Sequence, residues 1–194
     1  MNVTLISAGA EGLGPQYISA MLKQHGHHVR LAFDPTLFDD KVFLNQPTLA
    51  KMLSYTDIMI EEIIHKQPDI IGMTIVTDIW PWAQYVAKKI KEHLNVPIVA
   101  GGNHPTLVPE KVLADKNIDM VCMGEGEYAF TELVDAISQR KPYDHIPNIW
   151  LKKNKKILRN PLRNLIPNLD ALPFPDRSIY EPYLKTSDSY MTMS

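Results

Sequence analysis

The sequence has a single cysteine, Cys122, among its 194 residues. One thiol cannot form an internal disulfide or a multi-thiolate metal site, and it excludes an iron–sulfur cluster held by this chain alone. The residues around it, Met120, Val121 and Met123, are apolar. This setting indicates a small hydrophobic side chain in a buried strand.

The chain also lacks an excess of charge of either sign. Its 20 basic and 22 acidic residues leave a formal net charge of -2, so electrostatics give no reason to expect a nucleic acid or an acidic membrane as a partner. No apolar stretch is long enough to span a bilayer. The first residues lack the basic start and the long apolar run of a signal peptide. We therefore expect a cytoplasmic protein.

The sequence does contain a regular alternation of short apolar runs and segments with helical spacing. Strands are predicted at residues 3–6, 29–33, 70–76, 96–100 and 119–123, and helices at residues 15–24, 57–66, 82–93 and 128–139, with a short helix from Pro109. Such alternation implies right-handed crossovers and a parallel sheet. We predict a doubly wound, flavodoxin-like α/β fold with five strands in the order 2-1-3-4-5.

The chain changes character after residue 140, so we divide it into a domain at residues 1–140 and an appendage at residues 141–194. Residues 148–151 and 157–159 are predicted to pair as a hairpin, and the lysines between them are interpreted as a solvated turn. Residues 161–182 are rich in proline and are interpreted as an ordered linker that lies over a surface. Its apolar side chains are expected to be buried: Leu165, Leu169, Leu172 and Phe174. Residues 189–194 resemble the start of another strand.

The loops that follow the predicted strands indicate a ligand site. Ligands of open α/β sheets bind outside the carboxyl ends of the strands. Four loops are expected at that edge, and we call them the rim loops: residues 7–14, 76–82, 101–105 and 123–127. Three of them carry clusters of glycine, which lets the backbone approach a ligand closely. The sequence therefore predicts a binding site on this rim.

Two known phosphate chemistries fit the rim poorly. A dinucleotide site needs Gly-x-Gly-x-x-Gly after the first strand and an acidic residue about 20 residues later. Asp34 satisfies the second condition, but Gly9, Gly12 and Gly14 have the wrong gaps. A phosphate-accepting receiver domain would need an acidic cluster where residues 7–8 are Ser and Ala. The dinucleotide-binding domain of an oxidoreductase is kept as an alternative, and so is a non-catalytic interaction module.

The histidines give no clear metal site. His25, His27 and His28 surround a predicted helix end and are interpreted as an exposed turn. His104 follows the double glycine of the third rim loop, where it is placed to donate a hydrogen bond to a polar ligand. No metal ligand is assigned.

Five short motifs follow one another along the chain. They are Pro68-Asp69-Ile70-Ile71-Gly72-Met73-Thr74 with Thr77, Val99-Ala100-Gly101-Gly102-Asn103-His104-Pro105-Thr106, Ile118-Asp119-Met120-Val121, Gly124-Glu125-Gly126-Glu127 and Leu172-Pro173-Phe174-Pro175-Asp176-Arg177. Together they resemble the N-terminal cobalamin-binding domain of the radical S-adenosylmethionine enzymes. The resemblance covers nearly the whole chain and is specific in combination.

The resemblance implies that residues 1–140 bind cobalamin and that residues 141–194 lead toward an absent radical S-adenosylmethionine domain. In that family the following domain opens with Cys-x-x-x-Cys-x-x-Cys, whose thiolates hold an iron–sulfur cluster. This chain ends at Ser194 without such a motif, so we expect a fragment that binds cobalamin but does not catalyse. The full-length protein is expected to use the cluster and S-adenosylmethionine as a methyltransferase or cyclase.

The resemblance also implies which residues contact the cofactor. They are Gly9, Glu11, Gly12, Leu13, Gly14, Thr74, Val76, Thr77, Gly101, Gly102, Asn103, His104, Gly124, Glu125 and Gly126. The glycines are expected to form a flat rim for the corrin disc, and the threonines to provide polar groups for its nucleotide tail. Related domains ligate cobalt through the histidine of Asp-x-His-x-x-Gly in the first loop. With Gly14 at the final glycine, Glu11 stands at the histidine position, so no protein ligand to cobalt is expected there.

Overall fold

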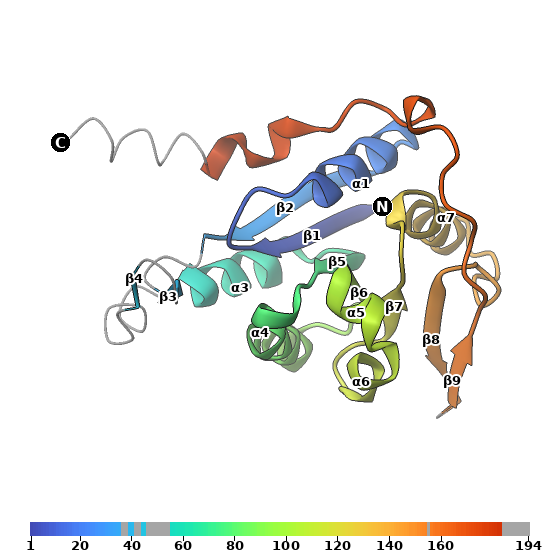
Figure 1. Cartoon of the computed structure of the whole chain (residues 1–194). Helices are drawn as coiled ribbons and strands as arrows, with labels where there is room; N and C mark the ends of the chain where they lie inside the picture. Colours follow the sequence, from blue (N-terminus) through green and yellow to red (C-terminus); the bar gives the residue numbers. More distant parts are fainter. Residues whose placement is uncertain (36–38, 41–43, 46–54, 155, 184–194) are drawn as a thin grey trace.

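The computed structural model describes residues 1–35, 39–40, 44–45, 55–154 and 156–183 (Figure 1). The main sheet has seven strands in the order β2-β1-β5-β6-β7-β8-β9. Their bounds are β1 Asn2–Ala8, β2 His28–Asp34, β5 Ile70–Thr74, β6 Ile98–Gly101, β7 Met120–Cys122, β8 Ile149–Lys153 and β9 Lys156–Arg159. Two short strands, β3 Asp39–Asp40 and β4 Leu44–Asn45, pair antiparallel in the connection after β2. The strand suggested for residues 189–194 lies outside the described residues.

Within the described residues, six α-helices connect and cover the strands. They are α1 Leu13–Gln24, α3 Tyr55–Lys66, α4 Trp80–His93, α5 Asn103–Leu107, α6 Pro109–Ala114 and α7 Gly126–Ser138. Three short 3-10 segments accompany them: η1 Thr77–Ile79, η2 Leu169–Ala171 and η3 Arg177–Tyr180. None of the helices in the described ranges combines the length and the apolar character needed to cross a membrane. Helix α5 begins within the third rim loop, where no helix was predicted from the sequence.

The parallel part of the sheet confirms the predicted fold class. Strand β1 lies between β2 and β5, so Leu5 pairs with Leu31 on one side and Gly72 on the other. Strands β6 and β7 follow in parallel. Ile70 and Ile71 point to opposite faces of β5, yet both are fully buried. Helices on both faces of the sheet explain why this strand is a continuous apolar run.

The helices form two layers around the sheet (Figure 1). One core cluster packs α3, α4 and α6 against one face, with Ile63, Ile90 and Leu113 among its buried residues. The other cluster packs α1 and α7 against the opposite face, with Leu22 and Leu133 buried. The chain therefore leaves β1 and β7 toward one face and leaves β2, β5 and β6 toward the other. This division positions the rim loops.

The predicted hairpin forms, but it extends the main sheet, so the predicted count of five strands was too low. Strand β8 pairs antiparallel with β7, where Ile149 lies opposite Cys122 and Leu151 lies opposite Met120. Ile149 and Leu151 are both buried in the layer beneath α7. The hairpin therefore covers what would otherwise be an exposed edge at β7.

The lysines of the hairpin are not all solvated. The Lys152 ammonium donates to the backbone carbonyls of Asp115 and Ile118, beyond the end of α6. Burial lowers the pKa of this lysine. Lys153 and Lys156 are exposed, as expected for a turn. The interpretation was wrong for Lys152 because pairing with β7 brings this part of β8 beside the end of α6.

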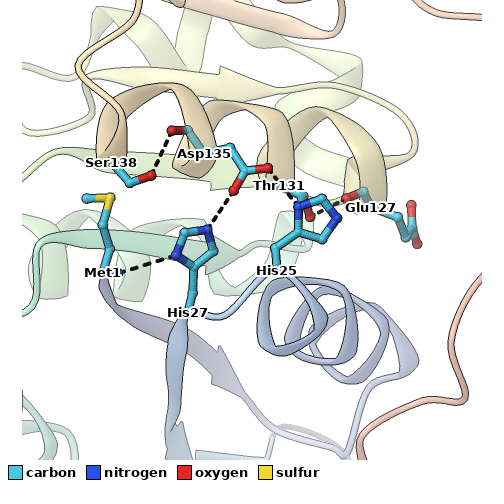
Figure 2. Close-up of polar contacts among 7 residues, drawn as sticks. All are labelled: Met1, His25, His27, Glu127, Thr131, Asp135 and Ser138. Carbon is cyan, nitrogen blue, oxygen red and sulfur yellow. Dashed lines mark hydrogen bonds and ion pairs between the residues drawn. The ribbon is translucent and has the colours of Figure 1, made fainter.

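The histidines at the end of α1 also differ from the prediction. Figure 2 shows His25 and His27 on either side of the Asp135 carboxylate, which extends from α7. Nδ1 of His25 and Nε2 of His27 lie 2.7 and 2.8 Å from its two oxygens. His27 is buried, and its Nδ1 lies 3.3 Å from the amino group of Met1. The turn therefore connects α1 and β2 to α7, and only part of it is exposed.

The proline-rich segment passes α7 and crosses α1 on the outside of the molecule (Figure 1). The Asp176 carboxylate accepts hydrogen bonds from Ser19 and Lys23 of α1, both at 2.6 Å. At its end, Ile179 and Tyr180 are buried in the layer between α1 and the sheet.

The apolar side chains expected to hold this segment are mostly in solvent. Leu165 and Leu169 are exposed, and Phe174 is 96% exposed. Leu172 is half-buried. The expected burial was therefore wrong for three of the four residues, because hydrogen bonds and the Ile179–Tyr180 pair attach the segment instead.

We expect the segment around Tyr180 to contribute to the stability of the whole domain. Tyr180 is 1% exposed and packs edge-on against Phe33 of β2, with ring centroids 5.3 Å apart. Tyr180→Ala should lower the free energy of unfolding by about 3–5 kcal/mol, because it leaves a large cavity in the core. Urea denaturation measures the change. Phe174→Ala is the matched control from the same segment, and its effect should stay below about 0.5 kcal/mol. Equal effects of the two substitutions would contradict the prediction.

Candidate functional site

The carboxyl ends of β1, β5, β6 and β7 place the rim loops at one edge of the sheet. Below this edge, on the face covered by α1 and α7, a cavity of about 270 Å³ extends between the helices and the strands. Its walls are largely apolar and rich in glycine. They consist of Leu5, Gly14, Pro15, Ile18, Gly72, Met73, Thr74, Val99, Gly101, Gly102, Cys122, Gly124, Glu125, Gly126, Glu127 and Phe130.

The cavity brings together about half of the residues proposed from the sequence. Gly14, Thr74, Gly101, Gly102, Gly124, Glu125 and Gly126 line it. The remaining proposed residues do not: Gly9, Glu11, Gly12, Leu13, Val76, Thr77, Asn103 and His104. These belong to the same loops or to the helices that begin there, above or beside the cavity. The loops after β6 and β7 thus contribute to the wall, whereas β5 contributes through its own strand residues and the first loop contributes mainly through α1.

The first rim loop is held by contacts within the protein. The amide Nε2 of Gln16 donates to Oε1 of Glu11 at 2.6 Å. The backbone N–H of Gly12 donates to the hydroxyl of Tyr180 at 3.2 Å. The proline-rich segment therefore fixes a loop that lies 168 residues away in the sequence. The Glu11 carboxylate, at the position where related domains carry a histidine, is thus hydrogen bonded to the helix that follows it.

His104 turns away from the cavity. Its ring is 5% exposed and lies against Trp80, with ring centroids 5.1 Å apart. Nδ1 lies 3.3 Å from the Thr77 hydroxyl, and Nε2 is buried without a hydrogen-bond partner. Burial, reinforced by the charge of Lys111, lowers the pKa of His104. The side chain joins the second and third rim loops, and it does not point into the cavity.

The fourth rim loop is fixed by the hairpin and the proline-rich segment. The side-chain amide of Asn148 donates to the carbonyl of Glu125 at 3.0 Å. The carboxylate Oε2 of Glu125 accepts the backbone N–H of Ile166 at 2.7 Å. The residues after position 140 thus determine how this loop meets the cavity.

Sequence reasoning missed the inner wall of the cavity, where Gly72 is the clearest example. A Cβ at this position would lie 3.0 Å from the ring of Phe130 and 3.1 Å from Leu5. Because Gly72 has no side chain, Phe130 packs directly on the central strand. A glycine inside an apolar strand often marks a close approach of another group, and this signal was present in the sequence.

Cys122 also lines the cavity, but its thiol is unreactive. Burial, together with the charge of Glu127, raises the pKa of this thiol to about 12. The neutral thiol is a small apolar wall element, as its neighbours in the sequence indicated. Within the described part of the chain, no group of three His, Cys, Asp or Glu side chains is arranged to hold a metal ion.

Comparison with known proteins connects this geometry to a family. The family model described as B12 binding domain matches residues 6–134. The chain is 36% identical over 166 residues to an uncharacterized methyltransferase, PH0819, of Pyrococcus horikoshii, and the match covers 84% of this chain and 32% of the relative. It is 28% identical over 160 residues to the cobalamin-dependent radical SAM methyltransferase TokK of Streptomyces tokunonensis, with coverage of 78% and 21%. The chain thus spans a third or less of these relatives.

A solved structure has a similar fold. OxsB, a cobalamin-dependent S-adenosylmethionine radical enzyme, was determined with aqua-cobalamin and S-adenosylmethionine bound. It superposes with a TM-score of 0.73 over 95% of this chain and 25% of the OxsB chain, at 19% sequence identity. At this identity the similarity supports the fold alone.

We expect the buried His104 to make the free energy of unfolding depend on pH. Its pKa is lowered in the folded protein, whereas the unfolded chain titrates near the ordinary value of about 6.5. Below that pH the unfolded chain binds more protons, so the free energy of unfolding should fall as the pH decreases from about 7.5 to 5. His104→Gln should make this dependence shallower. Urea unfolding of both proteins across this range tests it, and parallel curves would show that His104 does not contribute.

Proposed function

Because this chain belongs to the B12 binding domain family, we propose that its rim loops and the cavity beneath them hold a cobalamin. The family assignment confirms the resemblance found in the sequence, and the α/β fold agrees with it. The observation that supports this site is the cavity itself, since it opens among the glycine loops at the carboxyl edge of the sheet.

The volume of the cavity supports a placement in which one part of the cofactor lies in the cavity and the other part lies outside on the rim loops. Sites for drug-sized molecules have volumes of about 300–1,000 Å³, so a cavity of about 270 Å³ is too small for a corrin with its side chains. It suits the nucleotide tail, whose flat base would lie among Ile18, Val99 and Phe130. The corrin would then lie outside on the rim, where Gly102 and Gly124 allow close approach.

The polar groups near the cavity are few, which suits the flat, apolar base of the nucleotide tail. Thr74 lies on the same face of β5 as Gly72 and brings a hydroxyl to the cavity wall. Glu125 and Glu127 contribute carboxylates at the other side. A few placed polar groups in an apolar pocket determine the orientation of a ligand.

The bound cofactor would supply the reactive metal, while this chain positions it and limits access to it. Glu11, which stands where related domains carry the histidine that ligates cobalt, is hydrogen bonded to Gln16. The imidazole of His104 is buried against Trp80. Both observations support a site in which these loops provide no nitrogen ligand to cobalt.

For the longer protein we propose a cobalamin-dependent radical S-adenosylmethionine enzyme, a methyltransferase or a cyclase. Two curated relatives are named as methyltransferases, and this chain spans 32% and 21% of their lengths. Residues 1–140 would be the cofactor-holding domain, and residues 141–194 would connect it to a domain with the iron–sulfur cluster and S-adenosylmethionine. In this role the present chain contributes binding and no catalytic residue.

Direct binding tests the proposal. The purified chain should retain hydroxocobalamin through a desalting column and bind it with an affinity of about micromolar or better, measured from the change in the cofactor's absorption spectrum. NAD should not bind under the same conditions. Retention of NAD without cobalamin would favour the dinucleotide alternative, and binding of neither would contradict the proposed function.

Gly14 offers a sharper test of where the ligand lies. A Cβ at Gly14 would meet no atom within 4 Å, and its backbone has no positive φ, so a larger side chain should not disturb the fold. Gly14→Leu should weaken hydroxocobalamin binding by about tenfold or more, because its side chain would occupy the mouth of the cavity. Gly14→Ala should have a smaller effect. Equal affinities of all three proteins would place the ligand elsewhere.

Gly102 is less suitable for that test. Its φ is +96°, and a Cβ would lie 2.9 Å from the carbonyl oxygen of Ile75. Gly102→Val would therefore strain the backbone directly, and a loss of binding would not distinguish ligand contact from a damaged loop.

A further inference from the structure

Thr106 connects two of the glycines that line the cavity. Its hydroxyl donates to the carbonyl oxygen of Gly102 at 2.8 Å. The same hydroxyl accepts the backbone N–H of Gly124 at 2.9 Å. One side chain on α5 thus joins the loop after β6 to the loop after β7.

This connection lies beyond the end of the sheet ladder. Pairing between β6 and β7 includes Ala100 with Val121 and extends no further toward the rim. Among the described residues, no other hydrogen bond joins residues 102–107 to residues 123–127. Gly102 and Gly124 have φ values of +96° and +65°, so neither continues an extended strand. Within the described part of the chain, the Thr106 hydroxyl is therefore the direct hydrogen-bonded link between these two loops.

The neighbouring loop is fixed differently. The backbone N–H of Ile75 donates to the carbonyl of Gly101 at 2.8 Å, and the N–H of His104 donates to the carbonyl of Ile75 at 3.1 Å. The loops after β5 and β6 are thus joined by main-chain bonds that survive most substitutions. In contrast, the direct hydrogen bond between the loop after β6 and the loop after β7 is made by a single side chain.

We propose that Thr106 is a positioning residue that sets the spacing of the Gly102 and Gly124 loops and thereby the affinity for cobalamin. This inference rests on the proposed function. The hydroxyl is needed as both donor and acceptor, because Gly102 presents a carbonyl and Gly124 presents an N–H. Serine can replace it in both roles, whereas valine has the same shape and can form neither bond.

Three variants of the 194-residue chain test the role of the hydroxyl. Thr106→Val should raise the Kd for hydroxocobalamin by about fivefold or more, since a hydrogen bond that orders the site is lost. Thr106→Ser should remain within about twofold of the wild type. Thr131→Val is the matched control, because the Thr131 hydroxyl donates to the carbonyl of Glu127, also four residues earlier, and makes no bond to another loop.

Amide hydrogen exchange in the ligand-free chain gives a second readout. The Gly124 amide should exchange faster in Thr106→Val than in the wild type and in Thr106→Ser. Exchange of the Val108 amide, which donates to the His104 carbonyl, shows separately whether α5 itself is weakened. Thermal unfolding of each variant shows whether the protein remains folded.

The outcomes separate the two claims. A wild-type chain that does not bind hydroxocobalamin refutes the proposed function, and the role of Thr106 in affinity with it. A wild type that binds, with Thr106→Val equally tight, overturns only the positioning role. That role is also overturned if Thr106→Ser is as weak as Thr106→Val, or if Thr131→Val weakens binding by the same factor.

Discussion

The site depends on the divergence of the chain at the middle of its parallel sheet. After β1 the chain passes into α1 on one face, and after β5 it passes through η1 into α4 on the other. The two connections must separate, and a crevice opens between them where neighbouring parallel strands end. The cavity below lies on the α1 and α7 side, and its walls come from β1, β5, β6 and β7.

Residues far apart in the sequence then stabilise this crevice. Strand β8 covers the edge of β7, and Asn148, just before it, holds the carbonyl of Glu125. The proline-rich segment reaches α1 through Asp176 and the first rim loop through Tyr180. The described part of residues 141–183 therefore supports the cavity, although it adds no residue to its wall. In a longer protein, a movement of this segment would change the hydrogen bond between Tyr180 and the backbone N–H of Gly12.

The glycines around the cavity serve different physical purposes. Gly72 makes room for Phe130 and Leu5 inside the sheet. Gly102 adopts a positive φ beside the backbone of Ile75, where any side chain would collide. Gly14 is constrained by neither, because nothing lies near its missing Cβ. Of the three glycines, only Gly14 borders a part of the cavity that no neighbouring described side chain fills.

The sequence by itself determined the fold class, the positions of the five parallel strands and the glycine-rich segments that follow them. These follow from local patterns, since the period of apolar residues and the position of glycines are set by neighbouring residues along the chain. The burial of Cys122 followed in the same way from Met120, Val121 and Met123. The motifs in combination also indicated the family that the comparison confirms.

The tertiary structure alone decided which side chains face the cavity and which segments bury one another. His104 packs on Trp80, His27 is buried beside Asp135, and Phe174 stays in solvent. Each outcome depends on a partner that local pattern cannot specify, because the contact forms only when distant segments meet. The polarity of a residue sets what burial would cost, but whether it is buried is decided by the neighbour that the fold supplies.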